Sequence, residues 1–242
     1  NQYNFAGIRI TLSFIFPKTS GYFKNKSYSL NHGIEQEAVC LKEEDLELMR
    51  REYQPEEWNS TGEMKMLAPV VSDVLIKYDR MIFHSVAFIM SGRTWLLAAP
   101  SGTGKTTQYM NLKELHPDIR IICGDNPVLW FKDKTIEVHP SPWNGKENMG
   151  SAQTGILYGI ILLEQGQKNA IEILDKKEAV LPIMGQINTF MKTEETVHQV
   201  CRLEQRLLES VPVWKFRNTG TMESSEMLYR HLEDCGGAED EL

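Results

Sequence analysis

One short stretch of the chain, AAPSGTGKTTQ, places two glycines, a lysine and three threonines after an apolar run. Glycine permits the backbone turns that point successive N–H groups to one side, and such a row of donors cradles phosphate oxygens. Lys105 would reach the β- and γ-phosphates of a nucleoside triphosphate, and the Thr106 hydroxyl would bind the Mg²⁺ that bridges them. The stretch therefore predicts a site for ATP and Mg²⁺. The predicted nucleotide-binding residues are Ser101, Gly102, Thr103, Gly104, Lys105, Thr106 and Thr107.

The match to the usual phosphate-loop pattern G-x-x-x-x-G-K-[ST] is incomplete, because Ala99 stands where that pattern has its first glycine. The flanking residues nevertheless support the assignment. An apolar run, residues 93–98, precedes the glycines, and good helix formers follow them up to Pro117. A strand, a loop and a helix in this order are the setting that a phosphate loop needs. A glycine-rich turn with a purely structural role is the alternative.

A second group of residues, CGDNP, ends the apolar run that follows the expected helix. An aspartate there would lie beside the phosphates, where it can bind Mg²⁺ or accept the proton of an attacking hydroxyl. Asp125 is the leading candidate for either role. An aspartate before Asn-Pro is also a common turn former, and it is the neighbouring glycine loop that favours the functional interpretation.

A third group, SPWNGKEN, forms a proline-bounded loop. Lys146 could neutralise charge on a transferred phosphoryl group, and Trp143 could stack on a ligand or wall it off. The alternative is an ordinary turn with solvated charges. His84 lies in the strand expected beside the glycine loop, where it could bond phosphate, shuttle a proton or serve as a satisfied structural histidine. The catalytic candidates are Asp125, Lys146 and His84.

The elements that position these groups follow from the hydrophobic pattern. The runs MIFHSVAFIM and RTWLLAA flank Ser91-Gly92 and predict a hairpin whose second strand leads into the glycine loop. IRIIC predicts the strand that ends at Gly124-Asp125, and PVLWFKDKTIEVHP predicts a further hairpin. GIILLEQ predicts a buried strand. Asp175 with Glu178 predicts the start of one helix, and Thr193 caps another that runs to Leu208. A last helix is expected over about 222–233.

Three parts of the chain are expected. Residues 1–72 form a β-rich amino-terminal region, in which Ile8 to Phe16 alternate between apolar and polar and the charged run 42–51 is a short exposed helix or a loop. Residues 73–235 form the core that holds the glycine loop. Residues 236–242 form an acidic tail that is expected to be disordered.

Composition limits the classes of protein. The 242 residues, 41% hydrophobic and 24% charged, suffice for one large domain or for a main domain with an appendage. The net charge of -7 and the scattered Lys and Arg argue against nucleic acid or a membrane as partner. No apolar run approaches the ~20 residues of a membrane span, and no signal-peptide layout opens the chain, so we expect a cytoplasmic protein. The cysteines show no metal-ligand spacing, and we expect reduced thiols. They are Cys40, Cys123, Cys201 and Cys235.

The residues singled out above resemble those of a known group of proteins. SGTGKTT is similar to the phosphate loop of ATP-dependent phosphoenolpyruvate carboxykinase, GDN lies where that family and HPr kinase/phosphorylase carry Asp-Asp, and FHSVAF is similar to the His-Gly strand of HPr kinase. Together with SPWNGKEN, LEQG and VPVW, their order is most similar to small stand-alone HPr-kinase-like proteins of bacteria, some of which accompany peptide-modification genes. The resemblance covers about residues 73–233.

This resemblance implies an α/β (α+β) fold in which the phosphate loop lies in mixed, strongly twisted β-sheets with few helices. It implies that Lys105 and Thr106 bind phosphate and Mg²⁺, that Asp125 takes the first position of the Asp pair, and that Lys146 lies in a loop that supplies a cation. Asn126 departs from the pair, because an amide cannot act as a base and binds Mg²⁺ less well than a carboxylate. The second role then moves to Asp125, is supplied by Glu147, or is absent. The candidate metal ligands are Thr106, Asp125 and Glu147.

The first hypothesis for function is an ATP- and Mg²⁺-dependent kinase that phosphorylates a Ser or Thr hydroxyl of a small protein or a ribosomally made peptide. The alternatives are a nucleotide-binding accessory module without catalysis and phosphotransfer to a small molecule. Carboxykinase chemistry is disfavoured, because the chain is too short for the large additional domain of that family. We expect no nucleic-acid partner, and a homo-oligomer stays open.

Overall fold

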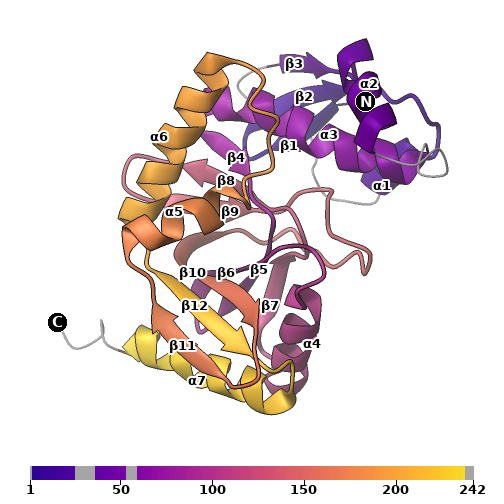
Figure 1. Ribbon diagram of the computed structural model, residues 1–242. Coiled ribbons are helices and arrows are strands. Elements are labelled where there is room, and N and C mark those ends of the chain that lie inside the picture. Colours follow the sequence, from indigo (N-terminus) through magenta and orange to yellow (C-terminus); the bar gives the residue numbers. More distant parts are fainter. Residues whose placement is uncertain (1, 25–35, 53–58, 238–242) are drawn as a thin grey trace.

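The computed structural model describes residues 2–24, 36–52 and 59–237 (Figure 1). Within them, a small sheet belongs to an amino-terminal unit at one end of the molecule, and a large sheet occupies most of the rest. The strands of the small sheet are β1 (Gln2–Phe5), β2 (Ile8–Leu12) and β3 (Gln36–Val39). Those of the large sheet are β4 (Arg80–Ile82), β5 (Ser85–Met90), β6 (Arg93–Ala98), β7 (Arg120–Cys123), β8 (Val128–Phe131), β9 (Ile136–His139), β10 (Gly155–Gln165), β11 (Ala170–Ile173) and β12 (Val213–Asn218). The helices are α1 (Thr19–Lys24), α2 (Glu43–Glu52), α3 (Ser60–Leu75), the 3-10 helix η2 (Ile76–Tyr78), α4 (Lys105–Leu115), α5 (Lys176–Met184), α6 (Glu194–Ser210) and α7 (Met222–Gly237).

The amino-terminal unit contains more helix than the β-rich pattern predicted. β2 does show the expected alternation of buried and half-buried residues, and it pairs with β1 across a turn in which Ala6 and Gly7 have positive φ. The unexpected element is α3, which begins at the cap Asn59 and buries Leu67, Val71 and Leu75 against the small sheet. Apolar side chains at intervals of four residues form one face of a helix. The boundary expected between residues 72 and 73 falls inside α3.

The large sheet is mixed, as the resemblance implied. Its main path has the order β4-β8-β9-β10-β6-β5-β7, and β12 pairs with β10 and β11. The long strand β10 changes partners along its length. Its first residues pair antiparallel with β9, and the residues beyond them pair parallel with β6 and β12. The expected α/β class with mixed sheets is therefore confirmed, although the helices α1–α7 are more numerous than the resemblance implied.

The hairpin that delivers the glycine loop is formed by β5 and β6, and its turn is at the predicted place. Ser91 and Gly92 have φ of 50° and 76°, the left-handed pair that a tight two-residue hairpin turn requires. The hairpin 128–139 and the strand at 120–123 also lie where the sequence predicted them, and the strand predicted over 159–165 begins earlier, at residue 155. In contrast, β4 is a separate strand that pairs with β8, so the apolar run before Ser91 is divided at Phe83 and His84.

Helices cover both faces of the large sheet (Figure 1). On one face, α4 and α7 pack next to each other over Val86, Phe88 and Leu97. On the other face, α5 and α6 pack over Ala87 and Leu96. Because successive strand residues point to opposite faces, a strand covered on both faces must be apolar along its whole length. This explains the continuous apolar runs of β5 and β6 in the sequence.

The helix starts in the carboxyl-terminal half confirm the predicted caps. The Asp175 side chain accepts hydrogen bonds from the backbone N–H groups of Lys177 and Glu178, and Thr193 accepts one from Thr196. The last helix extends to Gly237, so residues 236–237 are helical, contrary to the expected disordered tail. The remainder of that tail, residues 238–242, lies outside the described residues.

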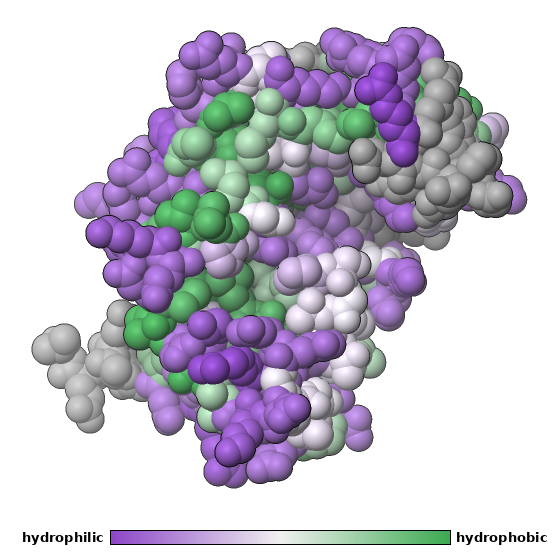
Figure 2. Space-filling model, viewed as in Figure 1, coloured by the Kyte–Doolittle hydropathy of each residue, from purple (hydrophilic) through white to green (hydrophobic). Residues whose placement is uncertain are grey.

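An apolar region of the surface lies near α5. Ile173, Val180 and Leu181 are 65%, 37% and 81% exposed, and Figure 2 shows green side chains over this part of the molecule. In the described part of the chain, no helix combines the length and the apolar character that crossing a membrane demands.

Candidate functional site

The loop between β6 and α4 holds the glycines in conformations that other residues rarely adopt. Gly102 and Gly104 have φ of 81° and 104°, and no heavy atom lies within 4 Å of a Cβ built on either. Backbone conformation, and not lack of space, therefore requires glycine at both positions. Gly104 is the N-cap of α4 and has no side chain to bond the first N–H groups of the helix. Those donors and the positive end of the helix dipole are features that bind an anion.

The side chain of Lys105 lies under this loop and is 8% exposed. Its Nζ donates a hydrogen bond to the carbonyl of Ala99 at 2.7 Å and lies 3.1 Å from Nε2 of His84. Burial lowers the pKa of Lys105 below its ordinary value, and the nearby Asp125 carboxylate acts in the opposite direction. The contact at residue 99 uses a backbone carbonyl, which explains how alanine can replace glycine there without loss of this bond.

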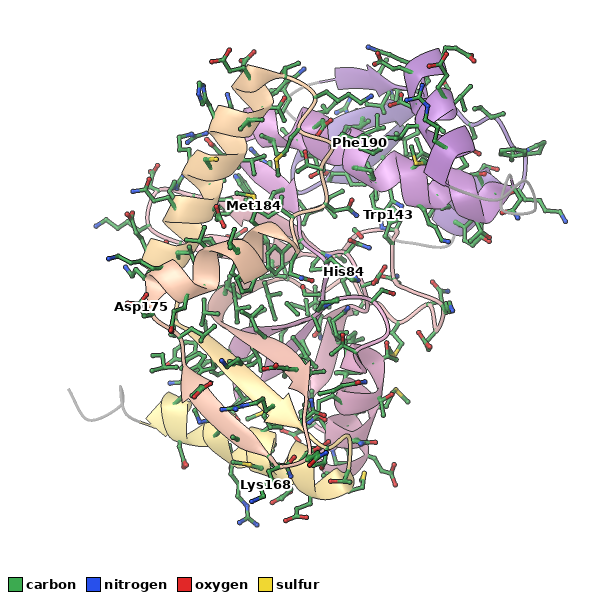
Figure 3. The ribbon with its side chains drawn as sticks, viewed as in Figure 1. His84, Trp143, Lys168, Asp175, Met184 and Phe190 are labelled. Carbon is green, nitrogen blue, oxygen red and sulfur yellow. The ribbon has the colours of Figure 1, made fainter. Side chains whose placement is uncertain are left out.

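Asp125 follows the end of β7, and its carboxylate lies near His84. Its Oδ1 lies 3.3 Å from Nε2 of His84, and its backbone carbonyl accepts a hydrogen bond from Ser85 at 2.7 Å. β6 and β7 both pair antiparallel with β5, and this pairing brings together Lys105, His84 and Asp125 from three separate segments. Nε2 of His84 has either a lone pair for the Lys105 ammonium or a proton for the Asp125 carboxylate, so it can bond only one of them at a time. Figure 3 shows His84 near the centre of the molecule, between the amino-terminal unit and the lower part of the large sheet.

The side-chain amides of Asn126 and Asn188 form a chain of hydrogen bonds that ends at Asp125. Nδ2 of Asn126 donates to Oδ2 of Asp125 at 2.6 Å, and Nδ2 of Asn188 donates to Oδ1 of Asn126 at 3.0 Å. Asn126 is 7% exposed and is therefore a buried link that orients the carboxylate. Sequence reasoning missed Asn188, which follows α5 in a segment without any recognisable motif. The backbone of this segment also holds the site, because Gln186 accepts a hydrogen bond from the His84 N–H at 2.7 Å.

The loop 141–148 contributes its charged residues as expected, but its tryptophan has a different role. Lys146 and Glu147 are exposed and line the cleft. A Cβ built on Gly145 would lie 3.5 Å from Cβ of Asp125 and 3.6 Å from Oε2 of Glu147, so the two acidic side chains flank this glycine. Trp143, in contrast, is only 6% exposed.

The ring of Trp143 packs into the amino-terminal unit. It stacks on Phe5 at a centroid distance of 5.8 Å and meets Phe23 edge-on at 6.0 Å. Its Nε1 donates to the carbonyl of Met64 in α3 at 2.7 Å. Stacking on a ligand is therefore not the role of Trp143, because both its ring and its N–H are engaged within the protein and the residue fastens the loop to α3. Trp143 does lie in the lining of the cleft, which agrees with the alternative that it walls off a ligand.

Replacement of Trp143 by phenylalanine tests this structural role. The phenyl ring keeps most of the aromatic packing but loses the N–H donor, so we expect the free energy of unfolding to fall by about 1 to 2 kcal/mol. Urea denaturation measures this change, and calorimetry with Mg·ATP should show affinity within about two-fold of the wild type. Lost nucleotide affinity with unchanged stability would contradict the structural role.

These residues line one cleft of about 1390 Å³ between the glycine loop and the amino-terminal unit. The glycine-loop residues Ser101, Gly102, Gly104, Lys105, Thr106 and Thr107 line it, with His84, Asp125, Asn126, Lys146 and Glu147. The opposite wall comes from α1, the turn before it, and α3, and the segment 185–188 completes the lining. Thr103 is half-buried, and its carbonyl accepts a long contact of 3.5 Å from Gln165.

The site fits Mg²⁺ only together with phosphate. Among the described residues, no group of three or more His, Cys, Asp or Glu side chains is arranged to hold a metal ion. Mg²⁺ bound to a nucleotide uses one or two protein carboxylates, with phosphate oxygens and water as its other ligands. Thr106 and Asp125, with Glu147 beyond Gly145, supply a ligand set of that size, and the uncapped start of α4 supplies donors for the phosphates.

Comparison with known proteins adds little to this geometry. No family model matches the chain, and no curated protein matches it in sequence. Among solved structures, the HPr(Ser) kinase/phosphatase from Coxiella burnetii aligns with 64% of this chain and 99% of its own, at a TM-score of 0.37 and 9% sequence identity. A similarity of this size identifies neither a family nor a function for the chain.

Proposed function

We propose that the chain is an ATP- and Mg²⁺-dependent phosphotransferase that transfers the γ-phosphoryl group to a Ser or Thr hydroxyl of a small protein or peptide. The observation that carries the proposal is the convergence of Lys105, His84 and Asp125 beneath a glycine loop that opens a helix. A merely structural turn has no need for a buried ammonium beside a carboxylate, because burying charge has a cost.

The nucleotide would be held by the glycine loop. The backbone N–H groups at the start of α4 donate to the phosphates, and the Lys105 ammonium offsets their charge from below. Thr106 would bind Mg²⁺ together with the carboxylate of Glu147 or of Asp125, and the ion would supply electrostatic neutralisation of the phosphate oxygens. When phosphates enter the site, Lys105 gains a stronger acceptor than His84, and the histidine is then released to bond Asp125.

The transfer itself would use Asp125 as the base. The acceptor oxygen forms a bond to the γ-phosphorus, the bond from that phosphorus to the bridging oxygen breaks, and ADP departs with the electron pair. The acceptor proton passes to Asp125, whose carboxylate Asn126 keeps in a fixed orientation. Lys146 lies on the same cleft and would stabilise the charge on the transferred group.

The size of the cleft supports a peptide as acceptor. Pockets for small ligands usually have volumes of about 300 to 1000 Å³, and this cleft, at about 1390 Å³, exceeds that range. Its lining also extends from the glycine loop to helices of a different unit. Both features suit a second, extended ligand beside the nucleotide.

The direct test is phosphoryl transfer from γ-labelled ATP to a library of Ser- and Thr-containing peptides, with Lys105→Ala as the inactive control. We expect label in peptide with the wild type and none with the variant. Binding of Mg·ATP without transfer to peptide, protein or small hydroxyl compound would overturn the kinase proposal.

A nucleotide-binding module without catalysis is the second candidate, and Asn126 favours it. The amide occupies the position where a second carboxylate would share the metal, and it is committed to hydrogen bonds with Asp125 and Asn188. Replacement of Asn126 by aspartate separates the two candidates.

With Asn126→Asp we expect transfer to rise, because a second carboxylate adds an anionic ligand for Mg²⁺. Without Mg²⁺ the variant should unfold more easily, by about 1 to 3 kcal/mol, because a like charge replaces the amide donor beside Asp125. Kinase assays and thermal unfolding with and without Mg²⁺ measure both effects. Gln167→Glu, an exposed change in the turn between β10 and β11 that does not line the cleft, is the charge-matched control. Absence of transfer from both the wild type and Asn126→Asp would support the module.

A further inference from the structure

The cleft is positively charged in a chain that is acidic as a whole. The chain has 26 Lys and Arg against 33 Asp and Glu. Among the described residues that line the cleft, the cations are Lys18, Lys65, Lys105 and Lys146, and the carboxylates are Asp125 and Glu147. A concave surface with low-dielectric walls concentrates the field of such charges, so the cleft attracts anions although the protein is an anion.

Two of the four lysines are not accounted for by the nucleotide. Lys105 and Lys146 belong to the glycine loop and to the loop beside it. Lys18 precedes α1 and Lys65 lies in α3, so both belong to the opposite wall of the cleft. Two hydroxyls accompany them on that wall, those of Tyr22 and Thr61, whose oxygens are 3.3 Å apart. We call these four residues the acceptor wall: Lys18, Tyr22, Thr61 and Lys65.

The acceptor wall is held in place by a buried carboxylate. Glu63 is fully buried in α3 and accepts hydrogen bonds from the backbone N–H groups of Ile15 and Phe16, at 2.6 and 3.1 Å, and from the Thr19 hydroxyl. These bonds fix the turn that carries Lys18 to the helix that carries Lys65. A buried carboxylate with several donors is a costly and specific arrangement, which a surface without a need for fixed geometry would not require.

The same wall is also joined to the catalytic side of the cleft. The hydrogen bond from the Trp143 indole to the Met64 carbonyl links α3 to the loop that carries Lys146. Met64 lies directly beside Glu63 and Lys65 in the sequence. The separation between the acceptor wall and the glycine loop is therefore set by packing, as it must be if two ligands are to meet between them.

We infer that the acceptor wall binds the phosphoryl acceptor, and that this acceptor is a peptide with carboxylates next to its reactive hydroxyl. The inference rests on the proposed kinase function and specifies its substrate class. Ammonium groups bind carboxylates through charge-assisted hydrogen bonds, and the Tyr22 and Thr61 hydroxyls are further donors for the same oxygens. A basic peptide would meet the positive cleft unfavourably.

Two peptides of equal length test the inference, one with a serine flanked by glutamates and one with the same serine flanked by glutamines. The wild type should phosphorylate the glutamate peptide with a KM about 10-fold lower. The double variant Lys18→Gln/Lys65→Gln should lose that preference, with KM for ATP unchanged.

The matched control is Lys134→Gln/Lys168→Gln, which removes two exposed lysines that do not line the cleft. Lys168 lies at the end of the molecule opposite the amino-terminal unit (Figure 3). This variant should keep the preference for the glutamate peptide. Equal KM values for the two peptides with the wild type would overturn the inference. A loss of ATP affinity in Lys18→Gln/Lys65→Gln would also overturn it, because the wall would then bind the nucleotide.

A binding measurement separates failure of this inference from failure of the kinase proposal. Fluorescence anisotropy of each labelled peptide, with Mg²⁺ and a non-hydrolysable ATP analogue present, reports on the acceptor wall without any transfer. Selective binding of the glutamate peptide with no phosphorylation would support the wall and overturn the kinase proposal. Phosphorylation without selective binding of the glutamate peptide would support the kinase proposal and overturn the inference about the acceptor wall.

Discussion

Asp125→Asn is expected to slow phosphoryl transfer by about 10² to 10⁴, the range that general-base catalysis contributes, while affinity for ATP stays within a few-fold. The amide has nearly the shape of the carboxylate and can keep a bond to Asn126 after rotation, but it cannot accept the proton of the acceptor hydroxyl. Single-turnover transfer from labelled ATP measures the chemical step, and calorimetry measures nucleotide affinity.

Titration with Mg²⁺ distinguishes the two roles open to Asp125. If its carboxylate mainly holds the metal, Asp125→Asn will also weaken Mg²⁺-dependent ATP binding, since a neutral amide replaces an anionic ligand. Asp133→Asn, an exposed change in the turn between β8 and β9, is the control for the lost charge. Unchanged transfer by a folded Asp125→Asn protein would remove Asp125 from the mechanism.

Lys105→Ala is expected to reduce ATP affinity by roughly 30- to 1000-fold, which corresponds to about 2 to 4 kcal/mol. The lysine ammonium lies under the glycine loop, and without it the β- and γ-phosphates would face only the dipoles of backbone N–H groups. Because burial already disfavours the charged form of this side chain, its removal should not prevent folding.

Calorimetry with Mg·ATP measures the effect of Lys105→Ala, and thermal unfolding confirms that the variant is folded. Lys134→Ala, an exposed lysine of the turn before β9, serves as the control. Unchanged affinity in a folded Lys105→Ala protein would show that the glycine loop is not a phosphate site.

Local signals explain why much of the fold could be predicted. The turn at Ser91-Gly92 and the caps at Asp175 and Thr193 depend on residues only a few positions apart, and each lies where the sequence placed it. The helix α3 was missed for a local reason as well. Gly62 and Pro69 lie inside it, and proline cannot donate to the carbonyl four residues earlier, so the segment lacks the composition typical of a helix.

The parts of the candidate site that were missed depend on contacts between distant segments. Asn188 reaches Asn126 from a segment 62 residues later, and Trp143 reaches Met64 from 79 residues away. Neither the sequence around Asn188 nor the proline-bounded loop of Trp143 contains a pattern that encodes such a partner. The juxtaposition of Lys105, His84 and Asp125 was more predictable, because β6 and β7 pair antiparallel with β5 and adjacent antiparallel strands bring their ends together.

The docking of Trp143 has a consequence for protein engineering. Residues 2–75 cannot be exchanged as an independent module. The loop that carries Lys146 and Glu147 also carries Trp143, and the Trp143 side chain packs against residues of this segment. A chimera with a foreign amino-terminal segment would need an aromatic pair in place of Phe5 and Phe23 and a carbonyl in the position of Met64. A graft that lacked these features would release the loop and disorganise the phosphoryl-transfer side of the cleft, even with every residue there unchanged.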